Sequence, residues 1–356
     1  MKKKSLSAKK KIHSNFNFKK ILKNKRIFEF YKVFVKSFEN INNSSKIAIS
    51  VSGGPDSMAL CFLISCYKFY TKNKIKTFFY LVDHGLRKNS GKEATFVKHQ
   101  LKLKKINLKI LKWKGKKPTS NLQSLARKKR YELIFNKCKK LNIETVLTAH
   151  HQDDIYETFF SRLLRGSGTE GLSSFAKTVK IFNFKNKKIL LGRPLLNLSK
   201  QDLIYISQNV FKFYVYDQSN EMEKFQRVRL RKLILNLKNQ GLDFNKLKLT
   251  INNLASSNKS INEIVNYNIS KNVTFLSNKK YLISTNFFLM PEEVIFRSLS
   301  ILIKKINQKD YPPRGKKVVS LIADLKNKEH LKATLGGAII QKIHNSVIVF
   351  KEKTKK

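Results

Sequence analysis

Residues 47–57 read Ile-Ala-Ile-Ser-Val-Ser-Gly-Gly-Pro-Asp-Ser, a pattern that predicts a buried strand running through a tight turn into a helix. The apolar residues at its start favour a parallel strand that is covered on both faces. Gly53 and Gly54 allow positive φ, and Pro55 suits the first helical turn, where its missing N–H costs nothing. N–H groups and the positive end of the helix dipole then face the turn, so we expect an anion to bind there. The turn is not a Walker A loop, because no Lys-Ser/Thr pair follows its last glycine.

The segment that follows alternates predicted strands (77–84, 108–113, 144–148) with predicted helices (90–105 and from residue 119 or 120 to 141). This alternation predicts an α/β fold with a doubly wound parallel sheet. Polar clusters at residues 52–57, 83–87 and 148–154 each follow a predicted strand. Ligands of such sheets bind beyond the carboxyl ends of the strands, so we expect these clusters to form one site.

The pattern changes after about residue 196, which indicates an appended domain. A helix at 199–209, a short aromatic strand at 213–216 and an arginine-bearing helix precede a mixture of helices and strands from about 245 onwards. We therefore predict three parts. Residues 1–26 form a basic, disordered arm, residues 27–220 form the catalytic domain, and residues 221–356 form an α+β C-terminal region that binds nucleic acid.

The composition points to a polyanionic partner. Of 356 residues, 74 are Lys or Arg and 23 are Asp or Glu, which gives a net charge of +51. Part of this excess reflects heavy use of Lys throughout the chain, but the remainder favours nucleic acid. The three cysteines have no disulfide or zinc spacing, which fits a cytoplasmic protein. No apolar run reaches the roughly 18–20 residues of a membrane span, and the basic start has no apolar segment typical of a secretory signal.

A second motif occupies residues 148–171, which read Thr-Ala-His-His-Gln-Asp-Asp-Ile-Tyr-Glu-Thr-Phe-Phe-Ser-Arg-Leu-Leu-Arg-Gly-Ser-Gly-Thr-Glu-Gly. Asp154 and Glu157 share one face of a predicted helix, and two such carboxylates can hold an ammonium group, a Mg²⁺ ion or a shared proton. Arg165 lies further along, where a guanidinium can reach phosphate. His150 and His151 lack the spacing of a zinc site, so we assign no metal-ligating residues and expect Mg²⁺ only together with ATP.

These motifs resemble a known family. Residues 52–57 resemble the pyrophosphate loop of N-type ATP pyrophosphatases, and the combination of motifs is similar to tRNA(Ile)-lysidine synthetases. The matching pieces are residues 52–57, Asp83-His84-Gly-Leu-Arg87, Asn121, Ala126-Arg127, Arg130-Tyr131, 148–171, 193–196, 217–220 with the arginines at 227–231, and 333–337. The resemblance covers residues 30–235 well and the remainder loosely.

The resemblance implies an adenine nucleotide alpha hydrolase-like fold and a two-step reaction. ATP, with Mg²⁺, adenylates the C2 oxygen of the wobble cytidine in tRNA(Ile) with a CAU anticodon, and free L-lysine then displaces AMP. Whether the protein forms a homodimer is left open by the sequence.

The resemblance also implies roles for individual residues. Catalytic roles fall to Asp56, Asp154, Glu157, His150 and Arg127. Nucleotide binding falls to Ser52, Gly53, Gly54, Pro55, Asp56, Ser57, His84, Arg87 and Arg165, and tRNA binding to Arg193, Arg227, Arg229 and Arg231. The lysine ammonium must lose a proton before it attacks, and the sequence does not say which carboxylate takes it.

Three alternative functions compete with this interpretation. A tRNA 2-thiocytidine synthetase would need cysteines in CxxC-type spacing, which are lacking. A GMP or NAD synthetase-like ligase would need an ammonia source, and no residue set for one is evident. A non-catalytic RNA-binding protein would bind RNA without releasing AMP, and the intact loop and carboxylate pair disfavour it.

Overall fold

The computed structural model describes residues 17–42, 44–71, 74–87, 89–115, 122–175, 178–215, 226–307 and 312–352. The chain divides into two compact units, one up to Leu247 and one from Lys248 onwards. A functional boundary at residues 220/221 stays a prediction, since the first compact unit also includes helix α9 (Gln226–Asn239), which packs on α6 (Gln152–Leu163).

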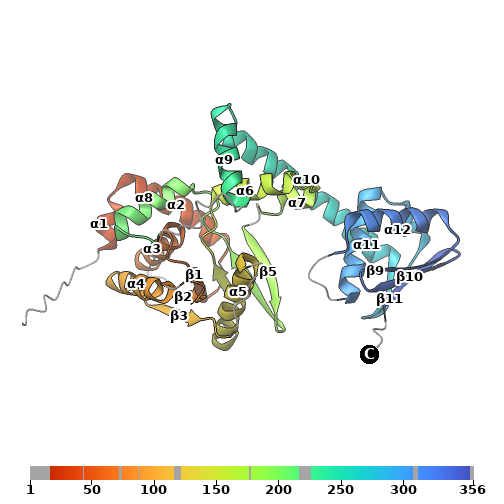
Figure 1. Ribbon diagram of the computed structural model, residues 1–356, viewed down its shortest axis with the longest axis horizontal. Helices are drawn as coiled ribbons and strands as arrows, with labels where there is room; N and C mark the ends of the chain where they lie inside the picture. The colour runs from red at the N-terminus through yellow and green to blue at the C-terminus, as the bar shows by residue number, and fades with distance from the viewer. Residues whose placement is uncertain are drawn as a thin grey trace, which may run out of the picture. The chain divides into compact units, whose positions relative to one another are not determined.

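The first unit is built on a six-stranded sheet (Figure 1). Its strands lie in the order β3 (Leu108–Lys112), β2 (Lys76–Asp83), β1 (Lys46–Val51), β4 (Thr145–Leu147), β6 (Lys187–Gly192) and β5 (Val179–Phe184). All neighbours are parallel except β5, which pairs antiparallel with β6. The predicted α/β fold with a doubly wound parallel sheet is confirmed.

Helices cover both faces of this sheet, and successive residues of β1 enter two different hydrophobic cores. Ile47 and Ile49 join the core formed with α2 (Lys25–Glu39), α3 (Pro55–Tyr70), α4 (Ser90–Leu103) and α8 (Lys200–Phe211). Ala48 joins the core formed with α5 (Leu122–Leu141) on the opposite face. Burial on both faces explains the continuous apolar run of this strand.

Two local expectations for the first unit differ from the structure, and one pair of strands was missed. Residues 17–26, expected to be disordered, contain α1 (Phe18–Leu22) and the start of α2, because Asn17 and Asn24 cap these helices and Leu22 is buried. The remainder of the expected arm lies outside the described residues. Residues 213–215 form no strand, although the Val215 amide donates to Gly53 O at 2.9 Å. The β5–β6 hairpin was not predicted.

The second unit is an α+β domain, as expected. Helix α10 (Phe244–Asn272) leads into an antiparallel sheet ordered β7 (Val273–Ser277), β8 (Lys280–Ile283), β11 (Ser346–Lys351), β10 (Ala338–Ile343) and β9 (His330–Leu335). Helices α11 (Glu292–Asn307) and α12 (Gly315–Asn327) contribute to its core, with the short η2 (Thr285–Leu289) beside them. Gly336 and Gly337 have positive φ and turn the chain from β9 into β10.

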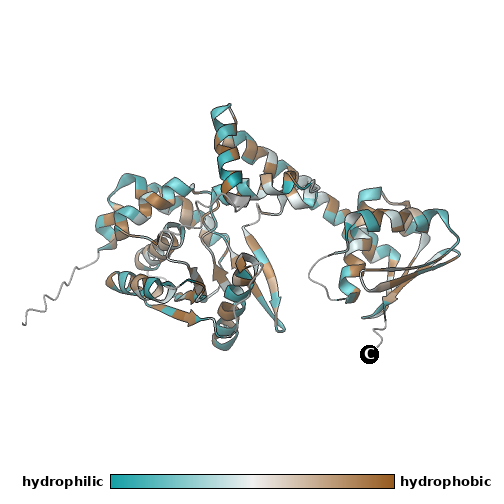
Figure 2. Cartoon of the chain, in the orientation of Figure 1, coloured by the Kyte–Doolittle hydropathy of each residue, from teal (hydrophilic) through white to brown (hydrophobic). Residues whose placement is uncertain are grey.

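Most helices carry hydrophobic and hydrophilic residues in alternation along their length, as Figure 2 shows. This is the pattern of helices with one face toward a core and one toward water. Among the described residues, no helix is long and apolar enough to cross a membrane.

Candidate active site

The glycine turn after β1 is held in shape by its own last residue. Ser57 Oγ accepts the N–H groups of Ser52 and Gly53, both at 3.1 Å, and donates to Gly54 O at 3.0 Å. The single hydroxyl proton of Ser57 is therefore used inside the loop, and Ser57 is only 3% exposed. Ser52 is exposed, and its Oγ donates to Ser57 Oγ at 3.1 Å, so its hydroxyl proton is also used inside the turn.

Gly53 must be glycine for two reasons, and we expect Gly53→Ala to destabilise the first unit. Its φ is +86°, and an added Cβ would lie 2.7 Å from Val97 Cγ2 and 3.1 Å from Val215 Cγ2. Backbone strain and overpacking together should lower the free energy of unfolding by about 2–4 kcal/mol, measured by urea denaturation. Gly241→Ala is the control, because Gly241 has φ +98° with nothing within 4 Å of its added Cβ. An equal loss in both variants would contradict the role of close packing.

Carboxylates and cations meet beside this loop. Asp56, the second residue of α3, accepts two hydrogen bonds from Lys200 Nζ, at 2.6 and 2.8 Å. His151 Nε2 lies 3.8 Å from Asp56 Oδ2 and 3.7 Å from Asp154 Oδ2. The His151 amide donates to Asp154 Oδ2 at 3.0 Å, which fixes the start of α6. The starts of α3, α6 and α8 therefore meet around one acidic cluster.

Glu157 lies on α6, one turn beyond Asp154, and is buried at 7% exposure. Its Oε1 accepts a hydrogen bond from Arg231 Nε of α9 at 2.5 Å. Burial disfavours the charge of Arg231, but Glu157 outweighs this and the pKa of Arg231 is raised. The guanidinium of Arg231 is thus held in its charged form beside Glu157.

His151 carries its charge more readily than a free imidazole. Burial opposes that charge, but the carboxylate of Asp153, 3.8 Å from Nδ1, and the charges of Asp154 and Asp56 outweigh it, so the pKa of His151 is raised. For Asp153, burial favours the neutral acid, but the nearby imidazole of His151 and the hydrogen bond from the Lys200 amide outweigh it and lower the pKa of Asp153. The acidic cluster is therefore partly neutralised by groups of the chain itself.

A basic group faces the acidic cluster. Arg127 Nη2 lies 3.2 Å from His150 Nε2, and Thr148 Oγ1 lies 2.8 Å from His150 Nδ1. A guanidinium only donates, so Nε2 must be the unprotonated acceptor and Nδ1–H donates to Thr148. Burial lowers the pKa of His150 to about 3, with Arg127 and Arg193 contributing and Asp154 opposing. His150 is thus a neutral group that orients Arg127.

The depressed pKa of His150 predicts loss of stability in acid. The unfolded imidazole takes up a proton below its ordinary pKa of about 6.5, whereas the folded one stays neutral to about pH 3. Between pH 7 and pH 5 the wild type should therefore lose about 2 kcal/mol more unfolding free energy than His150→Gln. Urea denaturation at both pH values measures this, with exposed His99→Gln as the control. Parallel losses in wild type and His150→Gln would contradict a neutral His150.

The arginines predicted to bind nucleotide or tRNA differ in their exposure. Arg193 is buried at 5% exposure, with its guanidinium 4.2 Å from the Phe175 ring centroid and its Nη1 donating to Phe175 O at 3.4 Å. Arg87 and Arg165 are exposed, and so is Arg229 of α9. Arg227 lies at the start of α9, and its side chain is outside the described part of the chain.

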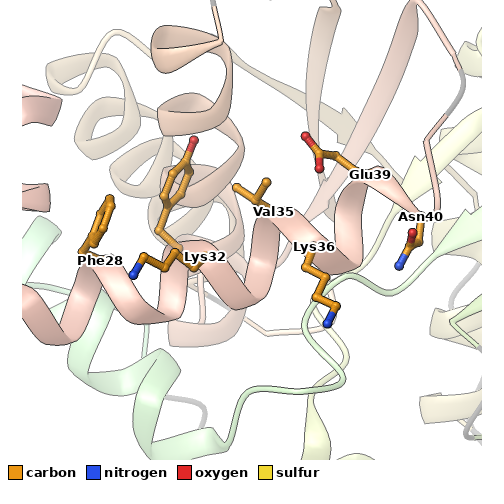
Figure 3. A pocket seen from close by; sticks show the side chains of 7 residues that line it. Phe28, Lys32, Val35, Lys36, Glu39 and Asn40 are labelled. Carbon is orange, nitrogen blue, oxygen red and sulfur yellow. The ribbon is translucent and has the colours of Figure 1, made fainter.

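Other candidate sites lie elsewhere. His84 stacks edge-to-face on Trp113 with ring centroids 5.8 Å apart. A cavity of about 410 Å³ runs along α2 from Phe28 to Asn40 and contains no predicted site residue (Figure 3). In the second unit, ligand atoms of three exposed residues, Glu329, His330 and His344, lie within 4.8 Å of one another. Exposed groups of this kind are common without an ion, so the absence of metal-ligating residues stays a prediction.

Comparison with known proteins identifies the family. Residues 22–238 match the PP-loop domain model. The chain is 33% identical over 335 residues to the tRNA(Ile)-lysidine synthase of Wolbachia pipientis wMel, covering 89% of this chain and 74% of that one. The corresponding protein of Orientia tsutsugamushi (strain Boryong) is 31% identical, covering 89% and 72%. The chain belongs to the tRNA(Ile)-lysidine synthase family.

A solved structure supports the fold. The U34-tRNA thiolase NcsA from Methanococcus maripaludis superposes with a TM-score of 0.52 at 16% identity, covering 68% of this chain and 81% of that one. At this identity the likeness concerns the fold alone. The PP-loop match and the lysidine synthase relatives confirm the family predicted from the sequence motifs, while the roles of individual residues stay predictions.

Sequence reasoning missed several groups of this site. Lys200 and Thr148 were not singled out, although each contacts a predicted residue. Asp153 and His151 were considered only as possible metal ligands, although Asp153 accepts a hydrogen bond from the Lys200 amide. Asp153, Thr148 and His151 lie inside the recognised 148–171 motif and could have been found there. Lys200 lies just after the recognised Arg193-Pro-Leu-Leu segment, but nothing local marks it as a partner of Asp56.

Proposed function

We propose that this chain is a ligase that forms lysidine in tRNA(Ile) with a CAU anticodon, using ATP and free L-lysine and releasing AMP and pyrophosphate. The observation that carries the proposal is the meeting of the glycine turn with Asp56, Asp154 and Glu157 at one edge of the sheet. A phosphate cradle beside carboxylates suits a reaction that combines a nucleotide with an amine. Family membership supports the same reaction.

In the first step, the cytidine C2 oxygen attacks the α-phosphorus of ATP and pyrophosphate leaves. The turn and the start of α3 would hold the departing pyrophosphate, since their N–H groups and dipole favour anions. Asp56 fits Mg²⁺, which prefers carboxylate oxygens and would supply charge neutralisation when bound with ATP. Arg127, held by neutral His150, would contact the adenylate.

In the second step, the lysine ε-nitrogen bonds to C2 while the C2–O bond breaks, and AMP leaves with that oxygen. Asp154 and Glu157 would bind the ammonium of the incoming lysine. The amine attacks only after losing a proton, because its ordinary pKa is about 10.4. One of the two carboxylates would take that proton. Lys200 and Arg231 favour deprotonation, because their positive charge opposes a second ammonium at this site.

The tRNA partner is supported by the charge of +51 and by α9. On this helix Arg229 is exposed between buried Val228 and Leu230, so it faces water, whereas Arg231 turns toward Glu157. We place the enzyme in the cytoplasm, where its tRNA substrate is found. The proposed reaction does not require a homodimer.

Arg229 should act in tRNA binding alone. We expect Arg229→Ala to raise the KM for tRNA and to reduce the slope of binding against salt by about one phosphate contact. The KM for lysine and the stability should not change, because Arg229 is exposed. Arg229→Lys is the control, since it keeps the charge. Unchanged tRNA kinetics in Arg229→Ala would show that the contact surface lies elsewhere.

Thiolation is disfavoured by the cysteines. Cys61, Cys66 and Cys138 are free and buried, and burial raises the pKa of each thiol, so none is poised as a thiolate. They occupy helices inside the cores and are not grouped as cluster ligands.

Incorporation of radiolabelled lysine into purified tRNA(Ile) with a CAU anticodon tests the proposal. We expect label that requires ATP and Mg²⁺, and none in tRNA(Met). Turnover of ATP to AMP with this tRNA but without label would keep the adenylation and reject lysine as the nucleophile. Neither label nor AMP would reject the proposed function.

A further inference from the structure

Lys200 and Asp56 form a close ion pair at the mouth of the glycine turn. Lys200 Nζ is 2.6 Å and 2.8 Å from the two Asp56 carboxylate oxygens, and the two side chains are 33% and 25% exposed. A half-buried ammonium needs a counter-charge, and so does a half-buried carboxylate. Each group is therefore satisfied by the other.

Both partners are mounted on rigid elements. Lys200 is the first residue of α8 and Asp56 the second of α3, and these two helices pack together, with Ser207 Oγ donating to Pro55 O at 2.6 Å. The Lys200 amide donates to Asp153 Oδ1 at 3.2 Å, which joins α8 to the start of α6. The ammonium is thus held where the positive ends of three helices meet, a place that attracts anions.

We infer that Lys200 is a nucleotide-binding residue that exchanges Asp56 for the pyrophosphate part of ATP, while Asp56 turns to Mg²⁺. This inference rests on the proposed function and adds Lys200 to its machinery. The exchange is chemically matched, because an ammonium binds phosphate oxygens well and a carboxylate is a preferred ligand of Mg²⁺. Two ion pairs replace one, and no bond forms or breaks.

The proposed exchange predicts different binding effects from those of a lysine that only stabilises the fold. Lys200 would attract pyrophosphate even without Mg²⁺, whereas Asp56 would repel it. Removing Lys200 should therefore weaken Mg²⁺-free binding, and neutralising Asp56 should strengthen it. A purely structural ion pair would make both changes weaken binding, because either one disturbs the same loop.

The test measures pyrophosphate affinity of the full chain by calorimetry, with and without Mg²⁺ and without tRNA or lysine. We expect Lys200→Met to weaken Mg²⁺-free binding by ~10- to 100-fold, the effect of one charge-assisted contact. Lys200→Arg should retain most of the affinity. Asp56→Asn should bind Mg²⁺-free pyrophosphate more tightly than wild type and lose the response to Mg²⁺. Lys212→Met, which removes an exposed charge at the other end of α8, should change nothing.

Two results would overturn the inference: unchanged affinity in Lys200→Met, or weaker Mg²⁺-free binding in Asp56→Asn. If Lys200→Met does not fold, the sign of the change in Asp56→Asn still decides. The outcome is independent of lysidine formation, because neither lysine nor tRNA is present. If pyrophosphate binds as expected but lysine is not incorporated into tRNA, the role of Lys200 in nucleotide binding stands and the proposed reaction is rejected.

Discussion

Asp56→Ala should reduce ATP-dependent AMP formation to background, a loss of at least ~10³-fold in kcat, while tRNA affinity stays mostly intact. The reason is position: Asp56 directly follows the glycine turn, and its carboxylate is shared by Lys200 and His151. Without it, no carboxylate of α3 remains for Mg²⁺, and two cations of the site lose their partner. AMP release in the presence of tRNA and lysine measures the first effect, and filter binding of labelled tRNA measures the second.

Asp324→Ala serves as its control. Asp324 forms an ion pair with Lys328 in the second unit at 2.6 Å, so this change also removes one carboxylate and one ion pair. It should leave AMP formation unchanged. Full activity of Asp56→Ala would reject the assignment of the turn as the ATP site.

Local patterns accounted for strands β1 to β4 of the sheet and for the turn. The run from Ile47 to Val51 is buried on both faces, so its hydrophobic periodicity does not distinguish a strand from a buried helix. The glycines and Pro55 that follow it mark the end of the strand and the start of the helix. The next strands follow the same alternation with helices. The sequence did not predict the β5–β6 hairpin, because Lys187 and Lys188 interrupt its apolar pattern. Its turn residues, Lys185 and Asn186, also include no glycine.

The site was predictable only where it lies in contiguous motifs. Asp56, Asp154 and Glu157 stand in two such motifs, and the sheet brings them together because both follow neighbouring parallel strands. Lys200 is 144 residues from Asp56 in the chain, so their contact depends on how α8 packs on α3. The Arg231–Glu157 pair likewise depends on how α9 packs on α6. Propensity and periodicity carry no information about such pairings.

Glu157→Gln should separate the two chemical steps. We expect AMP-forming adenylation to persist and lysine incorporation to fall through a rise in the KM for lysine of ~10²-fold, as for loss of a buried charge partner. The amide keeps the shape of the side chain and removes only its charge. Initial rates of labelled lysine incorporation over a range of lysine concentrations measure the effect. Glu132→Gln on α5, whose carboxylate pairs with Lys129, is the matched control.

The competing explanation is that Glu157 only anchors α9 through Arg231, and Arg231→Met distinguishes the two. If anchoring is the whole role, Arg231→Met must raise the KM for lysine as much as Glu157→Gln does, because both break the same 2.5 Å contact. If Glu157 receives the lysine ammonium, Arg231→Met instead leaves that carboxylate without its guanidinium and keeps or lowers the KM for lysine. The double variant should then resemble Glu157→Gln, since the carboxylate that Arg231 competes for is gone.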